Sequence, residues 1–390
     1  MKSQLMVFPA RSRTDNTPSG YAEAIFDYLN RSGSPEAARV RDLVEQLFAK
    51  LPLSARNEIL PRLRSGDDLQ HLSAFFELYL HSVLRSLKYK VTLHPTVKGT
   101  SRKPDFLVRR VFSRSFYVEA TVASHMSEQD LAAERREHVV YDALNRMTSP
   151  DFWLGLEIEG APESPPPGSV LRRRLRQWME GIDWESLRSR YEGGDIRSLP
   201  VFEFEHDGWA LRIRPIPKPA NMRGQPGIRP IGVQSRSFRL SNAKKSIRVA
   251  VTDKANAYGK LRKPLVVAVN SYGIHTDKED VLEALYGSAQ VVLEGHGRPK
   301  PILRTANDGA WIGPEGIRNT RVAAVLVLGS LSEWSIAARA PTLFINPFAR
   351  YQLRGPILRL PRVVVEGTEF VEKEGIGPQE IFGIKPPWPE

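Results

Sequence analysis

Cysteine is absent from this chain of 390 residues. Without thiols the chain can form neither disulfides nor cysteine-bound zinc sites, and a cysteine nucleophile is excluded. Long apolar runs are absent as well: eighteen consecutive apolar residues occur nowhere, and Met1 to Tyr21 lacks the apolar centre of a secretory signal. We therefore predict a cytoplasmic protein without a membrane segment.

The motifs of several large enzyme classes are missing too. The chain contains no G-x-x-x-x-G-K-[ST] phosphate loop, no H-E-x-x-H metal motif, no G-x-S-x-G nucleophile elbow and no dinucleotide-binding glycine pattern. These absences count against ATP-driven action by this chain and against the other chemistries that such motifs support.

Acidic residues are outnumbered by basic ones. The chain has 56 Lys and Arg against 44 Asp and Glu, which gives a net charge of +12 and an isoelectric point near 9.8. Because Lys and Arg neutralise phosphates, this balance favours a nucleic-acid partner, in first place DNA. A genome rich in arginine codons is the alternative explanation of the charge.

The length predicts two domains or one elaborated domain. Along the chain we expect a polar tail and helices over residues 1–66, a core over 67–160, and a proline-rich linker with basic helices over 161–200. Residues 201–390 alternate strands and helices and are expected to complete or enlarge the sheet of the core.

The core begins with an amphipathic helix from Asp68 to Leu87, which contains Glu77. A short strand, a loop and two further strands follow. The first of these two strands carries Pro104-Asp105, and the second carries Glu119, fourteen residues after Asp105. A helix from about Ser127 to Met147 comes next.

The two acids are expected to be near neighbours. The seven residues Arg109 to Ser115, rich in Arg and Ser, turn the chain back and pair the two strands as a hairpin. Side chains alternate along a strand, so Glu119 shares a face with Thr121. An acid in an otherwise apolar strand requires a partner or a metal, although an ordinary polar face of a half-buried strand is the alternative.

The order of these elements, with Glu77, Pro104-Asp105 and Glu119-Ala120-Thr121, resembles the PD-(D/E)XK nuclease superfamily, and the resemblance covers about a quarter of the chain. It implies an α/β fold of the restriction-endonuclease-like type. In that fold a mixed β-sheet core is flanked by helices, here with N-terminal helical and C-terminal α/β extensions. It also implies a hydrolase that cuts DNA as a nuclease or endonuclease, in bacterial defence or repair.

The same resemblance implies that Asp105 and Glu119 bind the metal ion. Oxygen ligands and the lack of cysteine favour Mg²⁺ or Mn²⁺ over zinc. Glu77 is expected to bind a second ion or to orient a water molecule. The alternative for Glu77 is an ion pair with an arginine on the surface.

The chain departs from the superfamily at Thr121, where a lysine is expected. A threonine hydroxyl cannot supply the fixed positive charge needed beside an attacking hydroxide, so either another cation substitutes or catalysis is lost. Lys103 is the first choice, because two residues before Asp105 it shares that face if the strand begins early. Further candidates, each with a surface role as the alternative, are Lys98, Arg102, Arg135, Arg136, Lys244 and Lys254.

Two function classes remain open. The first is a Mg²⁺-dependent nuclease, and the second is a nuclease-like protein that binds nucleic acid or a protein partner without cutting. A structural subunit is a third reading, and a second copy of the chain or a defence-system protein are partners that we keep open. A lysine or arginine within reach of both Asp105 and Glu119 would favour cutting, whereas a carboxylate pair that faces bulk solvent or forms a salt bridge with an arginine would favour the inert protein.

Overall fold

The structure is a computed structural model. It describes residues 5–124, 128–191, 194–225, 228–236, 243–259, 261–272, 276–294, 300–338, 340–367 and 369–390. The chain divides into two compact units, of which unit 1 takes Met1–Asn16, Ala24–His125 and Ser241–Glu390, and unit 2 takes Thr17–Glu23 and Met126–Leu240. Most of unit 2 is therefore one insertion into the sequence of unit 1.

Unit 1 contains a mixed eight-stranded sheet in the order β1-β2-β3-β8-β13-β14-β15-β16. The strands are β1 (Lys90–Leu93), β2 (Phe106–Arg110), β3 (Ser113–Ser124), β8 (Leu265–Tyr272), β13 (Val322–Gly329), β14 (Thr342–Ile345), β15 (Arg362–Glu366) and β16 (Glu369–Lys373). Strands β1, β2 and β3 are antiparallel neighbours, whereas β3, β8 and β13 run parallel. Strands from the second half of the chain thus join those of the first half.

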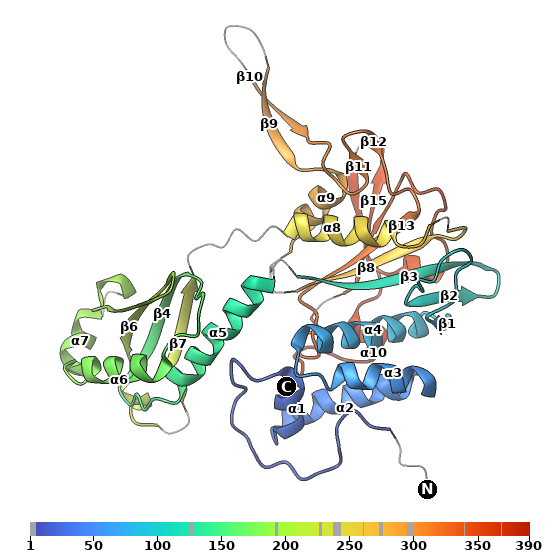
Figure 1. The fold of residues 1–390 in the computed structure, drawn as a ribbon. Helices are drawn as coiled ribbons and strands as arrows, with labels where there is room; N and C mark the ends of the chain where they lie inside the picture. Colours follow the sequence, from blue (N-terminus) through green and yellow to red (C-terminus); the bar gives the residue numbers. More distant parts are fainter. Residues whose placement is uncertain are drawn as a thin grey trace. The chain divides into compact units, whose positions relative to one another are not determined.

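Helices cover both faces of this sheet, as Figure 1 shows for α4 and α8. The helices of unit 1 are α1 (Ile25–Arg31), α2 (Pro35–Ala49), α3 (Leu53–Leu63), α4 (Asp68–Ser86), α8 (Ala243–Asn256), α9 (Lys278–Tyr286) and α10 (Pro378–Phe382), with the short 3-10 helix η3 (Pro356–Arg359). Between α9 and β13 lie the antiparallel pairs β9 (Ala289–Glu294) with β10 (Lys300–Thr305), and β11 (Ile312–Gly313) with β12 (Gly316–Ile317).

Alternation along β3 divides its side chains between the two helical layers. Val118 belongs to the apolar core on the α4 side, and Tyr117 belongs to the core on the α8 side. Strands β8 and β13 are apolar almost throughout and are buried on both faces, as parallel strands between helical layers usually are. Glu119, two residues after Tyr117, therefore faces the α8 layer.

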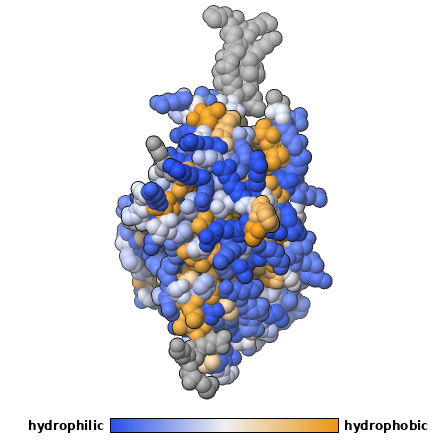
Figure 2. Space-filling model, turned by 90° about the vertical axis from the view of Figure 1, so that its right-hand side faces the viewer, coloured by the Kyte–Doolittle hydropathy of each residue, from blue (hydrophilic) through white to orange (hydrophobic). Residues whose placement is uncertain are grey.

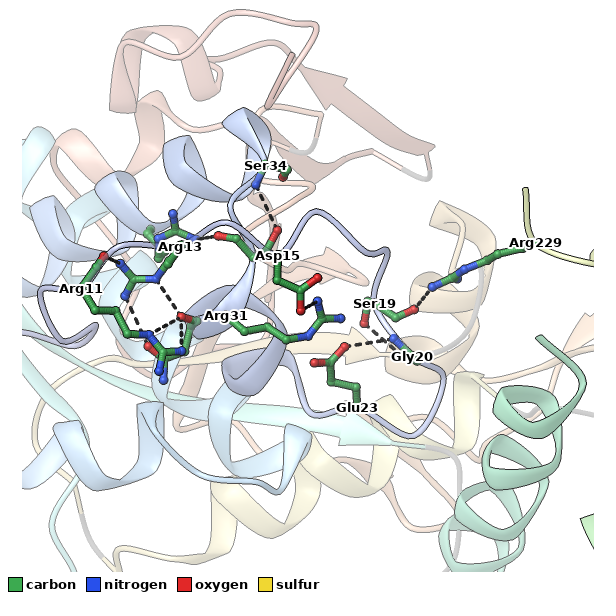
Figure 3. A network of polar contacts seen from close by, with 12 residues as sticks. Arg11, Arg13, Asp15, Ser19, Gly20, Glu23, Arg31, Ser34 and Arg229 are labelled. Atoms are coloured by element: carbon green, nitrogen blue, oxygen red, sulfur yellow. Dashed lines mark hydrogen bonds and ion pairs between the residues drawn. The ribbon is translucent and has the colours of Figure 1, made fainter. Parts of the chain in front are cut away.

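Arginine side chains connect the segment before α1 to that helix through hydrogen bonds and an ion pair. The backbone carbonyl of Asn30, in the last turn of α1, accepts hydrogen bonds from Nε of Arg13 (2.7 Å) and Nε of Arg11 (3.1 Å). Arg31 forms an ion pair with Asp15 at 2.8 Å, and Figure 3 shows these side chains close together. Carbonyls at a helix C-terminus lack partners within the helix and favour positive charge, so the arginines hold this part of the polar tail in place.

Unit 2 has its own four-stranded sheet in the order β5-β6-β4-β7. Its elements are α5 (Glu128–Asn145), β4 (Phe152–Gly160), α6 (Gly168–Met179), α7 (Trp184–Tyr191), η1 (Ile196–Ser198), β5 (Phe202–His206), β6 (Trp209–Pro217), η2 (Ala220–Met222) and β7 (Ile231–Arg236). Apolar side chains of α5 and α6 pack on those of β4, β5 and β6, and Leu187 of α7 packs with Phe152 and Ile216.

The coarse fold prediction is confirmed: this is an α/β protein with mixed β-sheets flanked by helices and with N-terminal helices. The arrangement along the chain differs from the consecutive regions that we expected. Strand β4, expected in the core over 67–160, pairs with β6 and β7 in unit 2. The stretch over 161–200 contributes α6 and α7 to the core of unit 2, and Ser127, the expected start of α5, lies outside the described residues.

Among the residues that the structure describes, none of the helices is both long enough and apolar enough to cross a lipid bilayer.

Candidate active site

Asp105 and Glu119 come together at the β2–β3 pair. Phe106 lies opposite Val118 in the register of this pair, which brings the two acids next to each other. The backbone N–H of Asp105 donates to Oε2 of Glu119 at 3.3 Å, and the N–H of Ala120 donates to Oδ2 of Asp105 at 2.6 Å. Each carboxylate is thus bound to the backbone of the strand or strand end that carries the other.

Two side chains, one in the last turn of α8 and one in the turn that follows this helix, contact the carboxylate of Glu119. Nζ of Lys254 donates to Oε1 at 2.7 Å, and the hydroxyl of Tyr258 donates to Oε2. The Glu119 residue is only 5% exposed. A buried carboxylate requires such compensation, because removing a charge from water without a partner is costly.

The sequence of α8 explains why Lys254 and Tyr258 reach the sheet. Ile247, Val251 and Ala255 are buried and recur every four residues, which defines the face of α8 that packs on the sheet. Lys254 lies next to Ala255 at the edge of this apolar stripe, and Tyr258 lies in the turn after α8, where it is buried in the same apolar core. A lysine next to an apolar stripe is a signal that can be read from sequence, whereas a tyrosine there is typical of an ordinary core position.

Glu77 projects from α4 and is buried, and its carboxylate forms an ion pair with Arg62 of α3 at 2.6 Å. Burial lowers the pKa of Arg62, but the hydrogen bond and the charge of Glu77 outweigh it and raise that pKa overall. The negative charge of Glu77 also acts on Asp105. The arginine pair considered as the alternative for Glu77 is therefore present, and it joins a buried glutamate to a half-buried arginine.

The pKa of Asp105 is raised by burial and by the negative charges of the carboxylates around it. Burial raises the pKa of its carboxyl to about 8, and the charges of Glu119 and Glu77 contribute in the same direction. The hydrogen bond from Ala120 and the charge of Lys254 lower this pKa. A positive ion beside Asp105 would relieve the same repulsion and favour the ionised carboxylate.

The donor set fits a magnesium or manganese ion that takes two protein carboxylates. Within the described part of the chain, Oδ1 of Asp105 makes no hydrogen bond, and it is not among the fully buried polar atoms without a partner. Oε1 of Glu119 keeps a further lone pair beside the bond that it accepts from Lys254, whereas Oε2 accepts two bonds, from the N–H of Asp105 and the hydroxyl of Tyr258. Mg²⁺ is commonly held by one or two carboxylates, with water and substrate oxygens as its other ligands.

A third acidic ligand is not provided by the described residues. Among them, no group of three or more His, Asp or Glu side chains is placed to hold a metal ion. Glu77 forms its ion pair with Arg62 instead, and it acts on the site through its negative charge, which raises the pKa of Asp105. The ligand oxygens of such a site would belong to Asp105 and Glu119.

The cations expected near the acids lie in different places. Lys254 contacts Glu119, whereas Lys244 pairs with Glu283 in the helical layer. Lys103 is exposed and meets the site only through its backbone carbonyl, which accepts a long hydrogen bond of 3.5 Å from Tyr258. Thr121 is half-buried on β3.

Among the described residues of unit 1, Lys98 and Arg102 form no hydrogen bond or ion pair with the acid pair. Lys98 and Arg102 are exposed in the loop before β2, although the charge of Arg102 acts on Tyr258. Arg135 and Arg136 belong to α5 in unit 2, where Arg136 donates to the carbonyl of Pro162.

Comparison with models of known protein families, with curated proteins and with solved structures yields no match to this chain.

Proposed function

We propose that this chain is a nuclease that hydrolyses phosphodiester bonds in DNA with the help of Mg²⁺ or Mn²⁺. The observation that carries the proposal is the convergence of three groups: Asp105, Glu119 and, 2.7 Å from Glu119, the ammonium group of Lys254. In this proposal Asp105 and Glu119 are the metal ligands. Lys254 supplies the positive charge that the superfamily takes from the position of Thr121.

The order of elements supports a restriction-endonuclease-like core. Helix α4 with Glu77, the three strands β1, β2 and β3, and helix α8 follow one another in unit 1 in the order that the resemblance requires. Most of unit 2 is inserted between β3 and α8. Within unit 1 the next helix after the acid-bearing strand β3 is therefore α8, although α5 of unit 2 follows β3 directly in the sequence.

The chemistry of these residues fits phosphodiester hydrolysis. A divalent ion on Asp105 and Glu119 would polarise a phosphoryl oxygen and lower the pKa of a bound water. Lys254 places a fixed positive charge where negative charge develops during attack on the phosphate. Tyr258 holds Glu119 in one orientation through Oε2, and burial together with the charge of Glu119 raises the pKa of its hydroxyl, which keeps the tyrosine neutral.

The distribution of charge supports a polyanionic substrate at unit 1. Unit 2 contains 17 Lys and Arg and 18 Asp and Glu, so its net charge is −1, and the total of +12 leaves +13 for unit 1. The positive charge thus belongs to the unit that carries the acid pair, as expected if that unit binds phosphates. Action in the cytoplasm is part of this proposal.

The proposal is tested by cleavage of plasmid and single-stranded DNA with Mg²⁺, with Mn²⁺ and with EDTA. We expect metal-dependent cleavage by the wild type and its loss in Asp105→Ala and Glu119→Ala. Glu283→Ala, which removes an acid paired with a lysine elsewhere in unit 1, is the matched control and should cleave normally. Equal cleavage by the wild type and both acid variants would exclude this site as the catalytic centre.

A second function is favoured by one observation: both oxygens of Glu119 already accept hydrogen bonds from Lys254 and Tyr258. If these bonds exclude a metal, the chain is a catalytically inactive nuclease-fold protein that binds nucleic acid, a defence-system protein or a second copy of itself. Calorimetric titration with Mg²⁺ separates the two functions. An inactive protein gives no Mg²⁺ binding and no cleavage, while its affinity for DNA still falls as salt rises.

A further inference from the structure

The turn between β2 and β3 exposes an aromatic side chain. Phe112 is 106% exposed and its neighbour Val111 is 76% exposed, so neither contributes to the apolar core. Phe112 also has a positive φ of 60°, a conformation that is unfavourable for a bulky residue without a glycine's freedom. Burial and backbone preference therefore do not explain a phenylalanine at this position.

Cations surround this turn. Arg109, Arg110 and Arg114 lie in and beside it and are exposed, and Lys90 of β1 lies directly opposite Arg109. Like charges opposite each other on neighbouring strands destabilise a sheet. The charges therefore reduce stability here in the absence of a partner.

A third segment adds to the same surface. The guanidinium of Arg114 lies 4.6 Å from the ring centre of Tyr351, and that of Arg350 lies 5.5 Å from it. Gly355 approaches the hairpin so closely that a Cβ there would lie 2.5 Å from Oγ of Ser113. The loop after β14 therefore packs against the start of β3.

We call this surface the hairpin patch, defined by Phe112 and Tyr351 with the cations Lys90, Arg109, Arg110, Arg114, Arg350 and Arg354. The segments 88–92, 109–115 and 350–355 that form it contain no Asp or Glu. Within the described residues, none of the six cations forms an ion pair with an acid. Figure 2 views the side of the molecule where β1 and β2 are labelled in Figure 1, and that surface is mostly hydrophilic with separate hydrophobic areas.

We propose that the hairpin patch binds single-stranded nucleic acid, with Phe112 stacked on an unpaired base and the arginines on flanking phosphates. Cations without an acidic partner match a phosphate backbone, and an exposed aromatic ring matches a free base face. In a duplex the base faces are covered by their neighbours, so the ring has no partner there. The inference rests on the proposed function, because it names the form of the substrate that the acid pair would receive.

The position of the hairpin fits this role. Asp105 precedes the first residue of β2, and Phe112 follows its last residue, so the two lie at opposite ends of this strand. At about 3.3 Å per residue the separation is roughly 20 Å. One strand of duplex DNA advances about 3.4 Å per phosphate and an unstacked strand advances further, so a base held by Phe112 lies within about six nucleotides of the phosphate at the acid pair.

The test is the fluorescence anisotropy of a labelled oligothymidine, an oligouridine and a blunt duplex, measured with the full chain in EDTA so that no cleavage occurs. We expect Phe112→Ala to weaken binding of the single strands roughly tenfold, as loss of one stacked base does. Phe112→Trp should restore the affinity. Val111→Ala is the matched control, because it truncates the exposed apolar neighbour in the same turn and should bind like the wild type.

The outcomes separate this inference from the nuclease proposal. Equal affinities of Phe112→Ala and Val111→Ala, or a duplex bound more tightly than the single strands, overturn the inference and leave metal-dependent cleavage untouched. Binding to vesicles of phosphatidylserine that requires Phe112, without such a requirement for the oligonucleotides, also overturns it in favour of a membrane surface. A Phe112-dependent single-strand affinity in a chain that never cleaves supports the patch and overturns only hydrolysis.

Discussion

Nζ of Lys254 lies 2.7 Å from Oε1 of Glu119, although 135 residues separate the two along the chain. The separation arises because most of unit 2 is inserted between β3, which carries Glu119, and α8, which carries Lys254. The pair ties the two sides of the insertion together within unit 1. Three predictions on the acid pair and its partners follow from this arrangement, and a fourth concerns the core of α4.

Lys254→Gln should abolish most of the cleavage. Removing one preorganised positive group beside a developing negative charge typically costs about 10²- to 10³-fold in rate, and we expect a loss of that size in kcat with little change in KM. Single-turnover cleavage of a labelled oligonucleotide in Mg²⁺ measures it. Lys254→Arg keeps the charge and should retain part of the activity.

The control for this variant is Lys244→Gln. Lys244 lies at the other end of the same helix and pairs with Glu283, so its loss removes one positive charge of α8 without touching Glu119. The prediction fails if the two glutamine variants cleave at the same rate. Thermal unfolding of both, measured in parallel, separates a catalytic loss from a loss of fold.

Tyr258→Phe should destabilise the metal-free protein. The variant removes the hydroxyl that donates to Oε2 of Glu119, and a hydrogen bond to a charged, buried group contributes about 1.5–3 kcal/mol. Urea unfolding in EDTA should show a loss of this size. Saturating Mg²⁺ should recover part of it, because the freed oxygen can bind the ion.

Tyr286→Phe is the comparison for this experiment. In the described part of the chain, the hydroxyl of Tyr286 makes no hydrogen bond, and its ring packs against Trp311. The loss of a hydroxyl alone should therefore change the stability little. Equal effects of the two substitutions, or an equal response to Mg²⁺, would show that the bond to Glu119 contributes nothing of its own.

The sequence predicts the local elements of this fold closely. The residue pattern predicts a helix over 278–286 and a strand over 342–345, and α9 and β14 have these bounds. Both follow from patterns that lie within the element itself, an amphipathic repeat in α9 and a short apolar run in β14. The hairpin of β5 and β6 around Asp207-Gly208 follows in the same way from its turn residues.

The pairing of distant elements is less accessible from sequence. Strand β4 has an apolar pattern that suits either sheet, so its place in unit 2 depends on partners that follow it in the chain. Strand β7 lies within residues 220–239, whose many Gly, Pro and Arg residues predict a loop, and it forms a strand because it pairs with β4. Lys254 was one of several candidate cations, and only the packing of α8 distinguishes it from the others.

Asp105 should make the metal-free protein more stable at low pH. Its folded pKa is about 8, whereas an unfolded aspartate titrates near 3.9, so between these values the folded state holds a proton that the unfolded state has lost. Stability therefore falls as pH rises from about 4 to about 8. Asp105→Asn removes this dependence, and urea unfolding at several pH values in EDTA measures the difference in slope.

Mg²⁺ should reverse the trend at the upper end of this range. An ion that binds only the ionised, folded carboxylate stabilises the protein more at about pH 8 than at about pH 5. Asp105→Asn should respond much less to Mg²⁺. A wild type whose stability does not change with Mg²⁺ at either pH value would contradict metal binding at Asp105.

His81 should produce a pH dependence of the opposite sign. Its ring is buried in α4, its Nδ1 lacks a partner among the described residues, and burial lowers its pKa to about 4. An unfolded histidine takes up a proton near pH 6.5, whereas the folded one stays neutral, so its contribution to stability is lost as pH falls from about 6.5 to about 4. The expected slope is about 1.4 kcal/mol per pH unit at most, and His81→Leu should flatten it. A wild type and a His81→Leu variant with parallel stability curves between these pH values would mean that the buried ring is protonated in the folded protein.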